Sequence, residues 1–155
     1  MKKVALQLIL ICLIAFAGYS QEVVLKEDGL YYTREGILYT GKQLEYHPNG
    51  NIKTELHINN GRINGNVYIF FEDGTKNEVR AYAHGVMHGQ WITWDETGQK
   101  IAEANYLDGL KNGKWNVWDE NGTLLYDMTY DMGKRSGTWR MFGEDGTLVS
   151  EKAFD

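Results

Sequence analysis

The sequence predicts an all-β fold, an elongated single-layer antiparallel β-meander built from tandem 24-residue β-hairpin repeats. Three observations predict it: glycines recur at one spacing, aromatic residues follow the same register, and turn residues stand at the middle of every unit. No window keeps a 3.6-residue period, and a glycine interrupts the chain about every ten residues, so helix is disfavoured.

The glycine spacing defines five units. Three columns hold 14 of the 18 glycines, and each column repeats every 24 residues without insertion. The columns are Gly41, Gly65, Gly89, Gly113 and Gly137; Gly50, Gly74, Gly98, Gly122 and Gly146; and Gly61, Gly85, Gly109 and Gly133. We therefore expect five repeats, residues 41–64, 65–88, 89–112, 113–136 and 137–155, after an N-terminal cap or degraded repeat at 21–40.

Turn residues at the middle of each unit predict one β-hairpin per repeat. Asn-Gly or Asp-Gly between short aromatic and β-branched runs is a strong hairpin signal, because glycine reaches the positive φ that such turns need. The turns are Pro48-Asn49-Gly50, Glu72-Asp73-Gly74, Glu96-Thr97-Gly98, Glu120-Asn121-Gly122 and Glu144-Asp145-Gly146. The return loops are expected at 61–65, 85–89, 109–113 and 133–137.

Aromatic residues form three columns in the same register. They stand two, five and seventeen positions after the first glycine: Gln43, Val67, Trp91, Trp115 and Trp139; Tyr46, Phe70, Trp94, Trp118 and Phe142; and Ile58, Tyr82, Tyr106, Tyr130 and Phe154. Residues three apart on a regular strand point to opposite faces, so Trp115 and Trp118 share a face only if a bulge intervenes. The columns either cover the backbone of a one-layer sheet or form an exposed ladder for sugar rings or partner side chains.

The first twenty residues read as a signal peptide. Lys2 and Lys3 give a positive start, an apolar run extends to Ala17, and small residues precede Gln21. The run is too short for a membrane span, which needs about 20 residues, so we expect export to the periplasm or cell exterior rather than a membrane anchor. The only cysteine, Cys12, lies inside that run, away from the cleavage site, so the protein is not expected to be a lipoprotein and its mature form has no thiol.

The charge balance argues against nucleic acid as a partner. The whole chain carries −5, and removal of Lys2 and Lys3 leaves 14 basic against 21 acidic residues, a net charge of −7. Nonspecific binding to nucleic acid depends on neutralising phosphates with Lys and Arg. We expect a protein partner, or contact with an envelope component or anionic surface.

The combined pattern resembles a known repeat. G-x-W-x-x-W/F-x-x-x-G followed by Y-x-x-G-x-x-x-G resembles the MORN repeat, specifically the variant of bacterial YwqK-like antitoxin family proteins, from Gly41 to Phe154. The first copy departs from the pattern at Gln43 and Pro48. The resemblance implies a scaffold for assembly and, in some such proteins, lipid contact.

Two groups of residues are candidates for partner binding. In the hairpin model the mid-repeat turns place Glu and Asp along one edge, and Lys42 and other basic residues lie along the opposite edge. This charge pattern either keeps the protein soluble or steers a charged partner. The candidate partner-binding residues are Trp91, Trp94, Trp115, Trp118, Trp139, Arg62, Lys111, Lys114, Lys134 and Arg135.

No motif in the sequence indicates catalysis, a cofactor or a metal. His84 and His88 flank a turn without a third ligand nearby, and no turn matches a calcium loop. We therefore expect no enzyme, but an exported noncatalytic interaction or scaffold module, binding through a sheet face or the terminal strand. Two alternatives are a YwqK-like antitoxin or immunity protein that neutralises a toxin by direct binding, and a glycan-binding aromatic repeat module.

Overall fold

A computed structural model of the protein describes residues 22–155. The predicted signal peptide, residues 1–20, lies outside the described residues. No helix in the described part of the chain is long and apolar enough to span a membrane. The strands are β1 (Val23–Leu25), β2 (Tyr31–Thr33), β3 (Gly41–Tyr46), β4 (Ile52–Asn59), β5 (Arg62–Ile63), β6 (Gly65–Phe70), β7 (Lys76–Ala83), β8 (Val86–Trp94), β9 (Lys100–Leu107), β10 (Leu110–Lys111), β11 (Gly113–Trp118), β12 (Leu124–Asp131), β13 (Lys134–Phe142) and β14 (Leu148–Phe154).

The strands form one long antiparallel sheet and one small sheet. The order in the long sheet is β14-β13-β12-β11-β9-β8-β7-β6-β4-β3, with β5 and β10 pairing with β4 and β9. Strands that follow one another in the chain are therefore neighbours in the sheet, which makes it a meander. β1 and β2 pair with each other in the small sheet, and Tyr32 of β2 also forms an isolated bridge with Leu38. The predicted fold class, a single-layer meander of hairpins, is confirmed.

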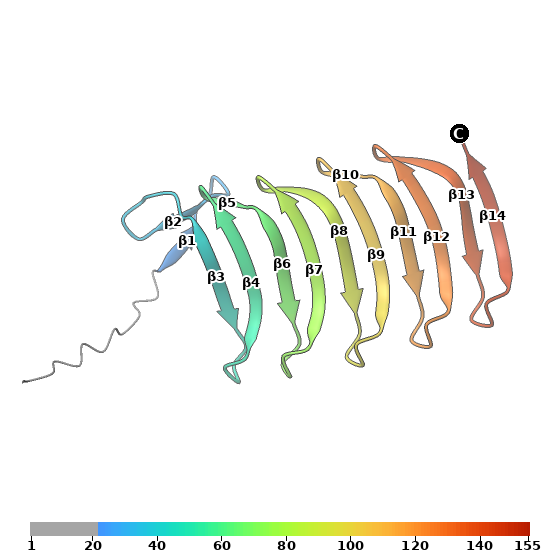
Figure 1. Ribbon diagram of the computed structural model, residues 1–155, viewed down its shortest axis with the longest axis horizontal. Helices are drawn as coiled ribbons and strands as arrows, with labels where there is room; N and C mark the ends of the chain where they lie inside the picture. The colour runs from blue at the N-terminus through green and yellow to red at the C-terminus, as the bar shows by residue number, and fades with distance from the viewer. Residues whose placement is uncertain (1–21) are drawn as a thin grey trace, which may run out of the picture.

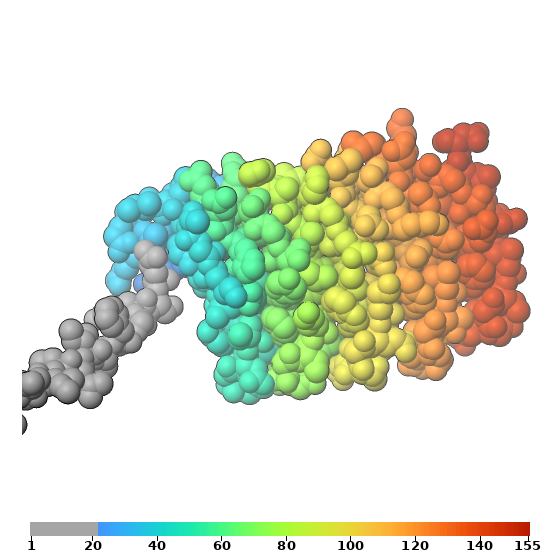
Figure 2. Space-filling model, viewed as in Figure 1, coloured from blue at the N-terminus to red at the C-terminus, as the bar shows by residue number. Residues whose placement is uncertain are grey.

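The five hairpins lie side by side in sequence order. Figure 1 shows their mid-repeat turns along one long edge of the sheet and the return turns along the other. In Figure 2 the repeats appear as adjacent bands of an elongated slab. Equivalent residues of successive repeats are separated by two strand spacings, about 9.6 Å.

The mid-repeat turns are three-residue loops that end in glycine. In the first one, the Gly50 N–H donates to the His47 carbonyl at 2.9 Å, and the His47 N–H donates to the Asn51 carbonyl at 2.8 Å. The same two bonds recur at the other mid-repeat turns. The strand pairing shifts in register next to each of these turns; in the first repeat the shift lies between Glu45 and Tyr46. The middle of each repeat is thus a hairpin, as predicted, with a bulge beside its turn.

The return turns differ from the prediction. Asn60 and Gly61 both have positive φ, 50° and 74°, as the two central residues of a type I′ turn do. The equivalent pairs are His84-Gly85, Asp108-Gly109 and Met132-Gly133. The strand resumes directly afterwards, so the expected loops of five residues were wrong. The type I′ turn matches the twist of the flanking strands and needs only two residues.

The first glycine column lies at a shift in register between repeats. Between β7 and β8, Arg80 pairs with Trp91 and Tyr82 pairs with Met87, so three residues of β8 stand opposite Ala81 alone. Gly89, inside this bulge, has φ +99°, and a Cβ there would lie 3.1 Å from the Ala81 Cβ. Backbone conformation and space both require glycine. Equivalent shifts occur at the other three junctions.

The most buried part of the sheet lies at its N-terminal end. Leu56, Ile58 and Val67 are 7%, 4% and 6% exposed. The residues packed against them are Tyr31, Tyr39, Ile63, Ile69 and Tyr82, the first two of which belong to the N-terminal segment, residues 22–40. Burial raises the pKa of the Tyr31 phenol. This segment therefore covers one face of the first two repeats.

The N-terminal segment docks on the first return turn. The Tyr31 N–H donates to the Gly61 carbonyl at 2.9 Å, and the Gly61 N–H donates to the Tyr39 carbonyl at 2.8 Å. A Cβ at Gly61 would lie 2.6 Å from Leu38 Cδ2 and 3.1 Å from the Tyr31 carbonyl oxygen. The turn thus has room for glycine only.

We predict that Gly61→Ala releases the N-terminal segment. Gly85→Ala is the matched control, because Gly85 has a similar φ of +86° but its Cβ would be 3.8 Å from the nearest atom. Both substitutions should lower the free energy of unfolding through the strained φ, by about 1 kcal/mol or more, and so lower Tm. Only Gly61→Ala should also make residues 22–40 sensitive to limited proteolysis. Equal protease resistance in the two variants would contradict this account of the docking.

Candidate functional site

One face of the sheet carries a continuous row of aromatic rings. Residues directly opposite on paired strands share a face, which places Arg80, Trp91 and Ala104 on one side, with the other Trp residues of the same column. Successive ring centroids are 4.8–5.7 Å apart. The rings are those of Tyr82, Trp91, Tyr106, Trp115, Tyr130, Trp139 and Phe154, and we call this side the ladder face. It is the face that the N-terminal segment covers at the other end of the sheet.

Three tryptophans of the ladder bond to the backbone of the preceding strand. The indole Nε1 of Trp91 donates to the Ala81 carbonyl at 3.2 Å. Trp115 donates to Asn105 at 3.0 Å, and Trp139 donates to Thr129 at 2.8 Å. The acceptors are equivalent residues beside the glycine bulges, where the strand ladder is interrupted. The indole N–H groups thus connect neighbouring repeats where the backbone pairing is weakest.

Basic side chains lie over the rings of the ladder. The Lys111 Nζ is 4.1 Å from the Trp115 ring centroid and 4.9 Å from that of Tyr130. The guanidinium carbon of Arg135 is 4.8 Å from the Trp139 centroid. These distances fall within the range of cation–π attraction. The ladder face therefore presents positive charge as well as aromatic surface.

The opposite side of the sheet, which we call the ion-pair face, has a different chemistry. Its central row runs across the paired strands through Glu55, Tyr68, Val79, Ile92, Glu103, Asn116, Asp127, Arg140 and Glu151. Lys100 pairs with Glu103 at 2.6 Å, and Lys114 pairs with Asp127 at 2.9 Å. The Lys100 ammonium is the first cause of the lowered pKa of Glu103. On this face the described carboxylates and cations largely neutralise one another.

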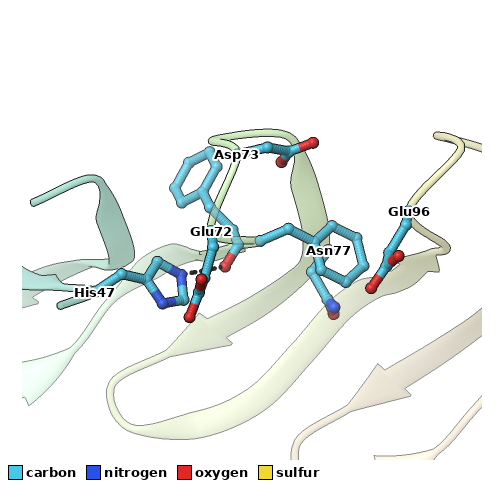
Figure 3. A pocket seen from close by; sticks show the side chains of 7 residues that line it. His47, Glu72, Asp73, Asn77 and Glu96 are labelled. Atoms are coloured by element: carbon cyan, nitrogen blue, oxygen red, sulfur yellow. Dashed lines mark hydrogen bonds between the residues drawn. The ribbon is translucent and has the colours of Figure 1, made fainter. Parts of the chain in front are cut away.

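The turn edge holds a broad depression but no convergent acids. A hollow of about 580 Å³ is lined by His47, Glu72, Asp73, Asn77, Glu96 and two phenylalanines (Figure 3). The His47 Nε2 lies 2.9 Å from the Phe70 carbonyl oxygen, and Asp73 points away from the hollow in Figure 3. Its carboxylate accepts the Thr75 hydroxyl at 2.6 Å and the Thr75 N–H at 2.8 Å. Within residues 22–155 no group of three His, Cys, Asp or Glu side chains is placed to hold a metal ion.

The repeat geometry agrees with a known family of sequences. Residues 39–60, 87–108 and 111–132 match the MORN repeat variant family. The chain carries MORN repeat variants. No curated protein matches it. The matched MORN segments include the first copy, whose Gln43 replaces tryptophan, and this copy pairs strand to strand as the others do, with Gln43 opposite Leu56.

The structure divides the predicted partner-binding residues of the MORN array among three places. Trp91, Trp115 and Trp139 lie in the ladder, whereas Trp94 and Trp118 lie on the ion-pair face, where Lys100 Nζ is 4.5 Å from the Trp118 centroid. All five rings are half-buried. Neither column alone is therefore the exposed one, since a single layer leaves both faces open.

The predicted basic edge is also divided. Only Arg62 and Lys134 are exposed beside the return turns without a ring or carboxylate partner among the described residues. Lys42 and Lys114 pair with Glu55 and Asp127 on the ion-pair face, and Lys111 and Arg135 lie on the ladder face. The expectation of one basic edge was therefore wrong. Because the return turns have two residues, the residues that follow them belong to strands and alternate between faces.

A groove that the sequence did not indicate lies at the C-terminal end of the ladder face. Its volume is about 270 Å³. The lining consists of Tyr126, Met128, Arg135, Trp139, Arg140, Met141, Ser150, Lys152 and Phe154. The floor is apolar and aromatic. Three residues of the lining are basic, of which Arg135 and Lys152 belong to the ladder face and Arg140 to the ion-pair row, and none is acidic. The alternation of β12, β13 and β14 residues was the signal that could have located it.

We predict that the indole N–H of Trp115 stabilises the array. Trp115→Phe keeps a ring in the ladder but removes the donor to Asn105, so it should cost about 1 kcal/mol and lower Tm by roughly 3 °C. Trp118→Phe is the matched control, because the Trp118 indole N–H has no acceptor among the described residues. Thermal unfolding followed by far-UV circular dichroism measures both. A Tm loss for Trp118→Phe as large as that for Trp115→Phe would refute the proposed role of the N–H.

We predict that the turn carboxylates stabilise the fold at neutral pH. The hydrogen bond from the Thr75 hydroxyl, with the Thr75 N–H, lowers the pKa of Asp73 below its ordinary value of 3.8. A depressed pKa in the folded state contributes stability above the ordinary value, and this is lost as the pH falls through the lowered pKa. Thr75→Val should therefore raise the pKa of Asp73 toward 3.8, measured by NMR titration. The pKa of Asp145, which Thr147 lowers in the same way, should not move in that variant; a parallel change at both sites would argue against a local cause.

Proposed function

We propose that the protein is an exported, noncatalytic interaction module that binds a protein or an envelope component along its extended sheet. The observation that carries the proposal is the ladder face, where half-buried rings and basic side chains continue from Tyr82 to Phe154. The matches to the MORN repeat variant family also support a binding module built from repeats. Arrays of this kind present long surfaces because each unit contacts only its neighbours.

The placement of the polar groups supports binding rather than catalysis. The turn carboxylates of Asp73, Asp95 and Asp145 accept bonds from their own loops. Glu103 and Asp127 are paired with basic side chains in the central row of the ion-pair face. A general acid or base must converge with other groups on a substrate, and these carboxylates do not converge. These carboxylates stabilise their own turns and strands.

Glycan binding, one of the alternatives, has less support from this surface. Sugars bind aromatic platforms through open ring faces, whereas Lys111, Arg135 and Arg80 lie over the rings of Trp115, Trp139 and Trp91. The rings also tilt against one another, with interplanar angles of 46–67°. The toxin-neutralising alternative uses the same surfaces and differs only in the partner.

The test is proximity labelling in living cells with a labelling enzyme fused after Asp155. We expect enrichment of one or a few envelope or extracellular proteins, and a mature N-terminus at Gln21 by mass spectrometry. The matched control is the same enzyme behind residues 1–20 alone. A partner that is toxic when produced without this protein would favour the neutralising alternative. An uncleaved cytosolic chain, or labelling identical to the control, would overturn the proposal.

A further inference from the structure

The basic side chains of the two faces have different partners at the C-terminal end of the sheet, although Arg80, further along the ladder face, pairs with Glu78. On the ion-pair face Lys100, Lys114 and Arg140 have carboxylate partners at 2.6–3.5 Å. On the ladder face Lys111 and Arg135, together with Lys152, have no carboxylate within ion-pair distance in residues 22–155. These three positive charges are therefore not neutralised by the described part of the chain.

The ladder holds these charges in defined places. Lys111 lies over Trp115 and Tyr130, Arg135 over Trp139 and Phe154, and the Lys152 Nζ is 5.2 Å from the Phe154 centroid. A cation–π contact holds a cation against a ring, and because the ring is neutral it does not neutralise the positive charge. Charge of this kind, above an apolar groove, fits a ligand that combines carboxylates with apolar groups.

The spacing of the cations identifies the conformation of such a ligand. Lys111 and Arg135 occupy equivalent positions in successive repeats, about 9.6 Å apart by the strand spacing. In a polyproline II helix, three residues per turn at 3.1 Å each bring every third side chain to the same side at about 9.3 Å. In a β-strand, side chains on one side recur at about 6.8 Å. The polyproline II repeat matches the array, and the β-strand repeat does not.

We propose that the ladder face from Lys111 to Phe154 binds an acidic peptide segment in the polyproline II conformation, with a carboxylate at every third residue. The carboxylates meet Lys111 and Arg135, the residues between them lie on the ladder rings, and the segment continues into the groove beside Arg135. Aromatic grooves bind polyproline II segments because such segments lose little entropy on binding. This inference rests on the proposed function, which it deepens by naming the surface and the chemistry of the partner.

A peptide fits the surface better than a membrane or a nonspecific polyanion does. The apolar groups form a recessed groove rather than protruding side chains, and the three ladder tryptophans that flank the cations are half-buried with their N–H groups already bonded. The chain as a whole is acidic, with a net charge of −5, which opposes attraction to polyanions in general. Recognition must therefore depend on the few cations of the ladder face and on the distance between them.

The experiment measures fluorescence anisotropy of two labelled peptides with the mature protein, residues 21–155. One peptide repeats Glu-Pro-Pro, and the other has the same composition with its glutamates adjacent. We expect the spaced peptide to bind more tightly, and its binding to weaken with added salt. The double variant Lys111→Gln, Arg135→Gln should lose roughly tenfold or more in affinity, whereas Lys114→Gln on the ion-pair face should change it less than twofold.

Further variants separate loss of charge from loss of fold. Lys111→Arg keeps the charge and should retain binding, and circular dichroism reports whether the double variant is folded. Equal affinity for the two peptides, tighter binding to anionic vesicles than to the spaced peptide, or unchanged affinity in a folded double variant would each overturn the inference. A partner found by proximity labelling alongside failure of both peptides would leave the proposed function standing and remove only this inference.

Discussion

The bond from a tryptophan indole to the carbonyl beside a glycine bulge is the interaction on which the rest of the array depends. Each junction between repeats interrupts the backbone ladder, and the interruption leaves a carbonyl with less than its usual pairing. In three repeats the indole N–H donates to that carbonyl, and the ring of the same side chain packs on the tyrosine or phenylalanine columns. In a sheet that has no second layer, one tryptophan thus supplies a hydrogen-bond donor for a backbone carbonyl and a ring that shields the backbone from water.

The two ends of the array cover the ladder face of the sheet with different residues. In the first two repeats Gln43 and Val67 replace tryptophan, and the N-terminal segment packs over Leu56, Ile58 and Val67 instead. Aliphatic side chains there are almost fully buried, whereas the ladder from Trp91 onward stays half-buried. The column that holds Gln43 and Val67 in the first two repeats holds tryptophan in the other three. The first two repeats are therefore buried under the N-terminal segment, and the other three leave an open aromatic surface. The binding surface is therefore the part of the array that has no segment of its own to cover it.

The sequence was sufficient for the architecture because glycine, turn and aromatic columns recur in one register, and each column reports a backbone requirement. It was less informative about the faces. Two of the return turns, Asn60-Gly61 and Asp108-Gly109, carry pairs typical of a type I′ turn, whereas His84-Gly85 and Met132-Gly133 do not. The strand bounds beside these turns were misplaced. That error put Lys111 and Lys114 on one edge, although three residues of alternation separate them onto opposite faces. The groove near Trp139 is lined by residues of three strands, so locating it required the alternation of all three strands together and not a single motif.

The return turns give the array a direction of growth. The Gly85 N–H donates to the Ile63 carbonyl, and the same bond recurs at Gly109 and Gly133. Each repeat thus supplies the carbonyl that accepts a hydrogen bond from the return turn of the next repeat. A duplicated 24-residue stretch would carry its own donors and acceptors in phase. Such a gene could lengthen or shorten by whole units without redesign, and selection could then set the reach of the molecule separately from its chemistry.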